Sequence, residues 1–109
     1  GYQRASALLA LNGIAALIVD PIGQGERYQL VEPDGRLTIG KSTAEHSLLG
    51  LGSNLLGRNT AHYEIWDGMR AIDYLQSRAE VDPKRIGCMG NSGGGTQSSY
   101  LMALDDRIQ

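Results

Sequence analysis

The fold is decided by the stretch RIGCMGNSGGG, residues 85–95 of a chain of 109 residues. The stretch begins with a short run typical of a buried strand, and its residues 90–94 fit the pattern G-x-S-x-G. A helix is predicted directly afterwards, from about Gly94 to Leu104. A strand, a glycine-rich turn and a helix in this order place the hydroxyl of Ser92 on a sharp bend, where it can meet a substrate.

The residues of this bend have separate expected roles. A serine hydroxyl is a weak nucleophile at neutral pH, so Ser92 requires a neighbouring base that activates it. The backbone N–H of Gly93 is expected to stabilise the oxyanion of a tetrahedral intermediate, with help from the helix dipole. Gly90 and Gly94 flank Asn91 and Ser92, and a β-carbon at either glycine is expected to clash where strand and helix nearly touch. Ser92 itself is expected in a strained backbone conformation.

Upstream of this bend, the N-terminal part of the chain has the pattern of a helix followed by a buried strand. Residues 3–11 carry apolar side chains at helical spacing, and the dipeptide NG at 12–13 is a typical left-handed helix stop. The run IAALIV at 14–19 is apolar throughout, as are strands that a parallel sheet buries on both faces. We therefore expect residues 14–19 to be a central strand.

The middle of the chain predicts one long connection and one long helix. Residues 21–59 contain many glycines and no sustained period, which indicates an irregular connection. A helix is predicted from Asn59 or Thr60 to about Arg78, and VDPK at 81–84 reads as a turn. The order helix, strand, loop, helix, strand, helix predicts the α/β class, with crossover helices on a parallel sheet.

Composition and charge exclude several function classes. The net charge is −2 with scattered basic residues, so no nucleic-acid partner is expected, and no apolar segment approaches the length of a membrane span. The single cysteine, Cys88, lies in an apolar run and is expected to be a packing residue. No cofactor is expected, because neither residues 23–25 nor residues 90–95 complete a dinucleotide-binding G-x-G-x-x-G, and a nucleotide-binding module is only a minor alternative. Glu45 beside His46 is too small a set for a metal site, so no metal is expected.

Residues 81–87 followed by 90–95 resemble the α/β-hydrolase superfamily, particularly its acetyl xylan esterase and dipeptidyl-peptidase-like branches. The segment DPIGQG at 20–25 is similar to the loop Asp-x-Arg-Gly-x-Gly-x-Ser of those proteins, from which Ile22 and Arg27 depart. The resemblance implies a partial α/β-hydrolase fold in which the bend is the nucleophile elbow. It also implies a catalytic triad in the order serine, acid, histidine.

The chain does not supply the rest of that triad. None of the 17 residues after Ser92 is a histidine, while His46 and His62 precede the serine and are expected in loop or surface roles. Asp105 and Asp106 are not assigned as the acid, and we expect them to form a solvated pair or a C-terminal turn. The second oxyanion donor is expected from a loop that precedes the first helix. Residues 1–109 are therefore expected to be a piece of a single α/β-hydrolase domain truncated at both ends, and to be inactive or barely folded alone.

The function that the resemblance implies is serine-dependent hydrolysis of a carboxylic ester. Acetyl xylan esterases act on short acyl groups, so the expected substrate is an acetyl ester of a carbohydrate or another small polar ester. A serine peptidase of the same superfamily is one alternative, and a non-catalytic binding protein with the α/β-hydrolase fold is another. The sequence indicates neither the compartment nor the oligomeric state.

Overall fold

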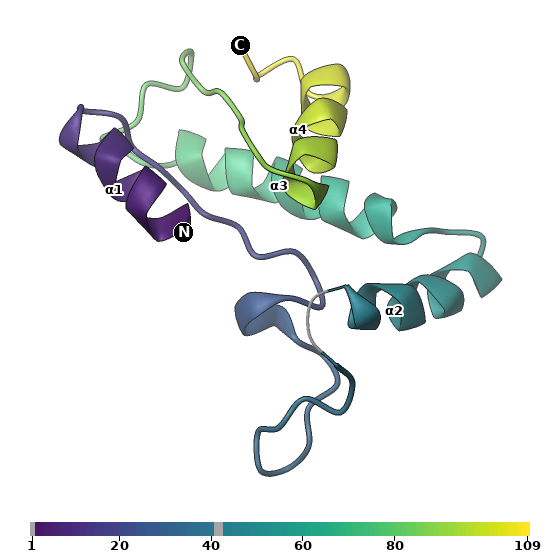
Figure 1. Ribbon diagram of the computed structural model, residues 1–109. Coiled ribbons are helices and arrows are strands. Elements are labelled where there is room, and N and C mark those ends of the chain that lie inside the picture. Colours follow the sequence, from purple (N-terminus) through teal and green to yellow (C-terminus); the bar gives the residue numbers. More distant parts are fainter. Residues whose placement is uncertain (1, 41–42) are drawn as a thin grey trace. The chain divides into compact units, whose positions relative to one another are not determined.

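The structure is a computed structural model that describes residues 2–40 and 43–109 (Figure 1). Its helices, in chain order, are α1 (Tyr2–Leu11), the short 3-10 helix η1 (Gly25–Arg27), α2 (Ala44–Leu55), α3 (Thr60–Gln76) and α4 (Gly93–Leu104). Positions 41 and 42 of the predicted connection lie outside the described residues. The chain divides into two compact units: the first joins the segment up to Val19 with Gly68–Gln109, and the second is Asp20–Asp67.

The first helix and its stop are as predicted. Gly13 follows the helix with φ +76°, a left-handed conformation that glycine adopts without steric cost. The Gly13 N–H donates to the carbonyl of Ala10 at 3.0 Å, and the Ile14 N–H donates to that of Leu9 at 3.1 Å. These two bonds satisfy carbonyls that the end of a helix leaves without partners.

The predicted parallel sheet is not observed among the described residues. Residues 14–19 belong to no strand, and Ile14, Leu17, Ile18 and Val19 are each more than 40% exposed, at 53%, 41%, 49% and 41%. A strand exists only when a neighbouring segment accepts its hydrogen bonds, and no described segment pairs with this run. Ile86 and Ile108 form a single parallel bridge, in which the Gln109 N–H donates to the Ile86 carbonyl at 2.9 Å. The strand expected at residues 85–90 is therefore reduced to one bridged residue.

The prediction of an irregular connection over residues 21–59 was wrong for its second half, which contains α2. Gly50 and Gly52 lie inside this helix, and because glycine is a poor helix former they hide the helical signal in the sequence. In the first half, Val31 and Leu37 form an antiparallel bridge around a tight turn. This bridge is the other isolated β-pairing among the described residues.

The long helix α3 has the predicted start and the predicted apolar stripe. The Asn59 side chain accepts a hydrogen bond from the His62 N–H at 3.0 Å, so Asn59 rather than Thr60 caps the helix. Ile72 on the stripe is 4% exposed. The next turn also forms where expected, because the Asp82 carboxylate accepts a hydrogen bond from the Lys84 N–H at 3.0 Å.

The core of the first unit lies where α3 meets the last third of the chain. Ile72 and Ile86 are its two buried apolar residues, each 4% exposed. Gly68 packs so closely on α4 that a β-carbon there would lie 2.8 Å from Leu101 Cδ1. The close contact therefore seats α4 on α3 at this glycine. Within the described part of the chain, every helix falls short of the length and apolarity that a membrane crossing needs.

Candidate active site

Ser92 has the backbone conformation of a residue on a sharp bend. Its φ is +53° and its ψ is −118°, and it is the one non-glycine residue with positive φ among the residues that the structure describes. A β-carbon disfavours this combination, so the surrounding structure must hold the residue there. Ser92 follows a segment without assigned secondary structure after Ile86 and immediately precedes the first residue of α4. The strain expected for this residue is present.

The hydroxyl of Ser92 is not used by the helix that it precedes. Serine in this position commonly accepts a hydrogen bond from the first turn, but Ser92 makes no such side-chain bond, and the residue is exposed. Its backbone carbonyl instead accepts the N–H of Thr96 at 3.0 Å, which starts the helical ladder. The side chain is therefore accessible to an incoming group.

The start of α4 provides amide donors beside Ser92. The first four N–H groups of a helix have no acceptor within it, and Gly93 is the first residue of α4. The Gly94 N–H donates to the Asn91 carbonyl at 3.0 Å, which closes the turn beneath the serine. The Asn91 side chain reaches α1, where its Nδ2 lies 3.5 Å from the hydroxyl oxygen of Tyr2. The turn thus uses the N–H of Gly94, and the N–H of Gly93, directly after the serine, takes no part in this bond.

The two glycines around the bend are not equivalent. A β-carbon on Gly90 would lie 2.2 Å from both the carbonyl carbon and the oxygen of Gly94, so the backbone leaves no room for a side chain at Gly90. A β-carbon on Gly94 would meet nothing within 4 Å. The expected clash is therefore found at Gly90, where a side chain would overlap the backbone of Gly94. The expectation was wrong for Gly94, because the space around its own β-position is open.

The two carboxylates after α4 differ in their surroundings. Asp105 is only 8% exposed and binds the guanidinium of Arg107, with Oδ2 at 2.6 Å from Nη2 and Oδ1 at 2.8 Å from Nε. This hydrogen bonding holds the pKa of Asp105 below its ordinary value and raises the pKa of Arg107. Asp105 also ends α4, where its N–H donates to the Leu101 carbonyl at 2.9 Å. The expected C-terminal turn is found, but Asp105 is buried and paired rather than solvated, while Asp106 is exposed.

Both histidines belong to the second unit, whereas Ser92 belongs to the first. His62 is exposed on α3, with its Nε2 2.9 Å from Nη1 of Arg58 and its ring edge-on to Tyr63. His46 lies on α2, and its Nε2 is the buried side-chain polar atom that lacks a hydrogen-bond partner among the described residues. The unit that carries the serine contains no histidine.

The glycine loop of the second unit is built around two carboxylates. The Asp20 side chain accepts the Glu26 N–H at 3.1 Å, and a β-carbon on Gly25 would lie 2.0 Å from that carboxylate. Arg27, one of the two departures from the similar loop, pairs with Asp67 of α3 at 2.6 Å. The loop is thus tied down by its own side chains.

Glu45 holds the same region from α2. It is 1% exposed and accepts the Gln29 N–H at 2.6 Å and the Leu30 N–H at 3.3 Å. A buried carboxylate whose oxygens accept backbone bonds has a structural role here. Within residues 2–40 and 43–109, no group of three or more His, Cys, Asp and Glu side chains is arranged to hold a metal ion.

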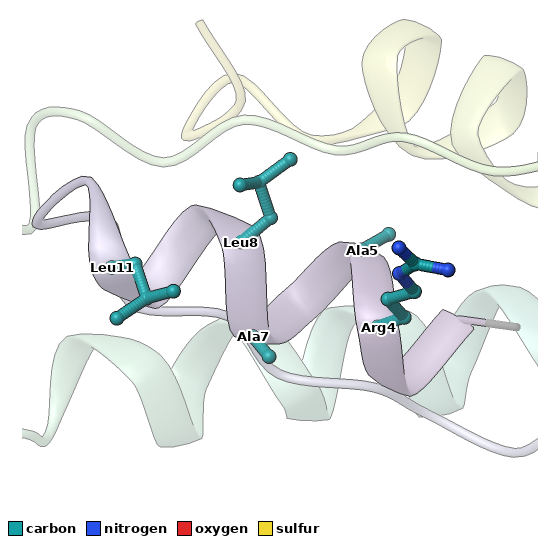
Figure 2. Close-up of a pocket in the computed structure, with 5 residues that line it drawn as sticks. All are labelled: Arg4, Ala5, Ala7, Leu8 and Leu11. Carbon is teal, nitrogen blue, oxygen red and sulfur yellow. The ribbon is translucent and has the colours of Figure 1, made fainter.

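Ser92 lines neither of two hollows on the surface of the described residues. Figure 2 shows the larger, about 560 Å³, which is lined by five residues of α1: Arg4, Ala5, Ala7, Leu8 and Leu11. Because one helix supplies the whole lining, the hollow is a groove on the helix surface, and Leu8 and Leu11 are 63% and 85% exposed there. The other, of about 290 Å³, lies in the second unit beside Leu49 and Tyr63.

Cys88, which was expected to be a packing residue, is half-buried, and its sulfur lies 3.6 Å from the Ser98 carbonyl oxygen.

Residues 52–108, more than half of the chain, match the prolyl oligopeptidase family. The matched region includes α3, the bend at Ser92 and the Arg107 pairing, and it confirms the resemblance to the α/β-hydrolase superfamily. Within that superfamily the chain belongs to the prolyl oligopeptidase family. The family implies the α/β-hydrolase fold.

One curated relative is "Putative hydrolase YtaP" of Bacillus subtilis (strain 168). The identity is 51% over 45 residues, which are 41% of this chain and 15% of that protein. The chain thus matches a small part of the length of this relative. No solved structure matches the chain.

Proposed function

We propose that this chain carries the nucleophile of a serine-dependent carboxylic ester hydrolase, and that Ser92 is that nucleophile. The observation that carries the proposal is the strained conformation of Ser92 at the start of α4, with its exposed hydroxyl unused by the helix. Such strain costs about 1–3 kcal/mol and persists where the surrounding structure over-determines it, as functional sites do. Membership of the prolyl oligopeptidase family supports the same role.

In the proposed reaction, the Ser92 hydroxyl oxygen attacks the acyl carbon while a general base takes the hydroxyl proton. The Gly93 N–H donates to the developing oxyanion, and the positive end of the α4 dipole adds to the stabilisation. The alcohol leaves with a proton from the same base, and water then cleaves the acyl-enzyme. None of the residues after Ser92 is a histidine, so the proposal assigns the base and its acid partner to parts of the complete protein outside residues 1–109.

The proposed substrate is a short acyl ester, such as an acetyl group on a carbohydrate or a small polar alcohol. The resemblance of residues 81–95 to acetyl xylan esterases supports this choice. The same resemblance supports the expectation that the chain is a piece of one α/β-hydrolase domain. A serine peptidase is the second candidate, and the description of the matched family favours it.

Hydrolysis of p-nitrophenyl acetate by the complete protein tests the proposal. The Ser92→Ala variant is expected to lose at least about 10³-fold in kcat, because the nucleophile is removed while binding remains. Ser99→Ala is the matched control, since Ser99 is an exposed serine within α4 whose hydroxyl donates to its own helix at the Gly95 carbonyl, 3.0 Å away. Equal activity of wild type and Ser92→Ala would refute the nucleophile role.

A proline-containing peptide p-nitroanilide separates the two candidate substrates. Turnover of the acetyl ester with at least about 10²-fold lower kcat/KM on the anilide favours the esterase. The reverse preference, with Ser92→Ala inactive on both, favours the peptidase. A folded wild-type protein that turns over neither substrate would indicate a binding protein that retains the bend.

A further inference from the structure

The guanidinium of Arg107 uses all five of its N–H groups. Nε and Nη2 bind the two carboxylate oxygens of Asp105 at 2.8 and 2.6 Å. Nη1 donates to Asp73 at 2.5 Å and to the Gln76 side chain at 3.1 Å. The second Nη2 hydrogen reaches the Met69 carbonyl at 3.4 Å. A guanidinium has five donors in a fixed planar fork, so this set of acceptors leaves it no freedom to rotate.

These acceptors lie on two different elements. Asp73, Gln76 and Met69 belong to α3, whereas Asp105 terminates α4. The Arg107 side chain is 31% exposed, and that of Asp105 is 7% exposed, so the bidentate pair is shielded from water on the carboxylate side. Arg107 therefore clamps the C-terminal end of α4 to α3.

The same clamp fixes the segment that leads into the bend. Ile108 follows Arg107 directly and forms the parallel bridge with Ile86, six residues before Ser92. Gly68 on α3 contacts Leu101 on α4, one turn before the clamp. The incoming segment at Ile86 and the outgoing helix α4 are thus both tied to the neighbourhood of Arg107.

We propose that Arg107 is a positioning residue for Ser92, acting through α4 and the bridge between Ile86 and Ile108. This inference rests on the proposed function, because it concerns the geometry of the same nucleophile. A helix of 12 residues is about 18 Å long, so a tilt of about 5° at the clamp moves the far end by about 1.5 Å. A displacement of about 1 Å at a reacting group can cost on the order of 10²-fold in rate. The clamp lies at the opposite end of α4 from Ser92, so the full length of the helix separates the tilt from the serine.

The test measures ester hydrolysis by the complete protein, with concentrations set by titration of reactive serine with a fluorophosphonate. Arg107→Met is expected to lower kcat per titrated site about 10–100-fold with little change in KM. Arg107→Lys, which keeps the charge but loses the bidentate fork, is expected to fall between this variant and wild type. Arg78→Met is the matched control. Arg78 also pairs with a carboxylate two residues away, Glu80, and its guanidinium lies over the Tyr74 ring of the adjacent α3, but within the described part of the chain it forms no ion pair with a helix.

Asp73→Asn separates positioning from local stabilisation. It weakens the link to α3 while leaving the bidentate pair with Asp105 intact. A positioning role predicts a lower kcat per titrated site in this variant too, and this variant also serves if Arg107→Met does not fold.

Unchanged kcat per titrated site in both Arg107→Lys and Asp73→Asn, with only a lower melting temperature, would overturn the inference and leave the proposed function intact. An active wild type with an equally active Ser92→Ala would overturn the proposed function, and the inference with it. An equal loss in Arg78→Met would also overturn the inference, because the effect would then not depend on the clamp.

Discussion

Replacing Ser92 by glycine is expected to make the protein more stable while abolishing its proposed activity. At φ +53° and ψ −118° a side chain costs about 1–3 kcal/mol, and glycine removes that cost because it has no β-carbon. Glycine also gains freedom in the unfolded chain, which offsets about 0.5–1 kcal/mol. The net expectation is a stabilisation of about 0.5–2 kcal/mol.

Ser92→Ala is the reference for this comparison, because alanine retains the β-carbon and therefore the strain. The hydroxyl is exposed and makes no cap bond, so its loss alone is expected to change the free energy of unfolding by less than about 0.5 kcal/mol. Both variants lack the hydroxyl that we propose as the nucleophile, so any difference in stability between them reports the backbone.

Urea unfolding of the complete protein, followed by circular dichroism, measures the difference. With an m-value of about 1–3 kcal/mol/M, the midpoint of Ser92→Gly is expected to lie roughly 0.2–2 M above that of Ser92→Ala. A midpoint for Ser92→Gly at or below that of Ser92→Ala would refute the argument that Ser92 is strained. Ser99→Gly, at an ordinary helical position of α4, is the control and is expected to be destabilising by about 0.5–1 kcal/mol.

Three further predictions follow from individual contacts within the two units. Gly90→Ala is expected to destabilise by at least about 1–3 kcal/mol because its β-carbon would overlap the Gly94 backbone, while Gly94→Ala, with an open β-position, is expected to be neutral or stabilising in the same urea assay. Glu45→Gln replaces one acceptor oxygen with a donor opposite two backbone N–H groups, and a loss of about 1–3 kcal/mol is expected by thermal denaturation; no loss would contradict the structural role of Glu45. Hydrogen bonding to Arg107 lowers the folded pKa of Asp105, so its stabilisation is fully present above the unfolded pKa of about 3.9 and is lost as pH falls through the lower folded pKa. Asp105→Asn should therefore flatten the acid limb of stability against pH below about pH 4, and an unchanged limb would show that the pair contributes nothing.

The bend at Ser92 could be predicted because its signal is local. The pattern in residues 90–94 predicts which position carries the serine and which position has no room for a side chain. The positive φ of Ser92 and the close approach of backbone at Gly90 agree with this prediction. The helix at α3 was predictable for a similar reason, since its apolar stripe and its cap at Asn59 lie within one segment. The open β-position of Gly94 was not predictable, because it depends on the direction of the helix rather than on the pattern.

Features that depend on distant partners were missed. The glycines of α2 weakened the helical pattern in its sequence, because glycine is a poor helix former. The helix forms with the support of tertiary contacts, such as the bonds that Glu45 accepts from the N–H groups of residues 29 and 30. The clamp at Arg107 had one available signal, an acid two residues before a basic residue at 105–107, but nothing in the sequence indicated Asp73 as its second partner. The parallel sheet stays a prediction for the opposite reason: residues 14–19 have the composition of a strand, yet no described segment pairs with them.

The exposed run at 14–19 has a practical consequence for producing these residues by themselves. The hexapeptide IAALIV carries no charge, proline or glycine, and among residues 2–40 and 43–109 no strand pairs with its amides. Such segments associate edge to edge with their own copies and seed insoluble aggregates. Expression of the 109 residues alone should therefore yield inclusion bodies or soluble oligomers held by this run. Exchanging Leu17 for lysine should act as a gatekeeper and return material to the soluble fraction.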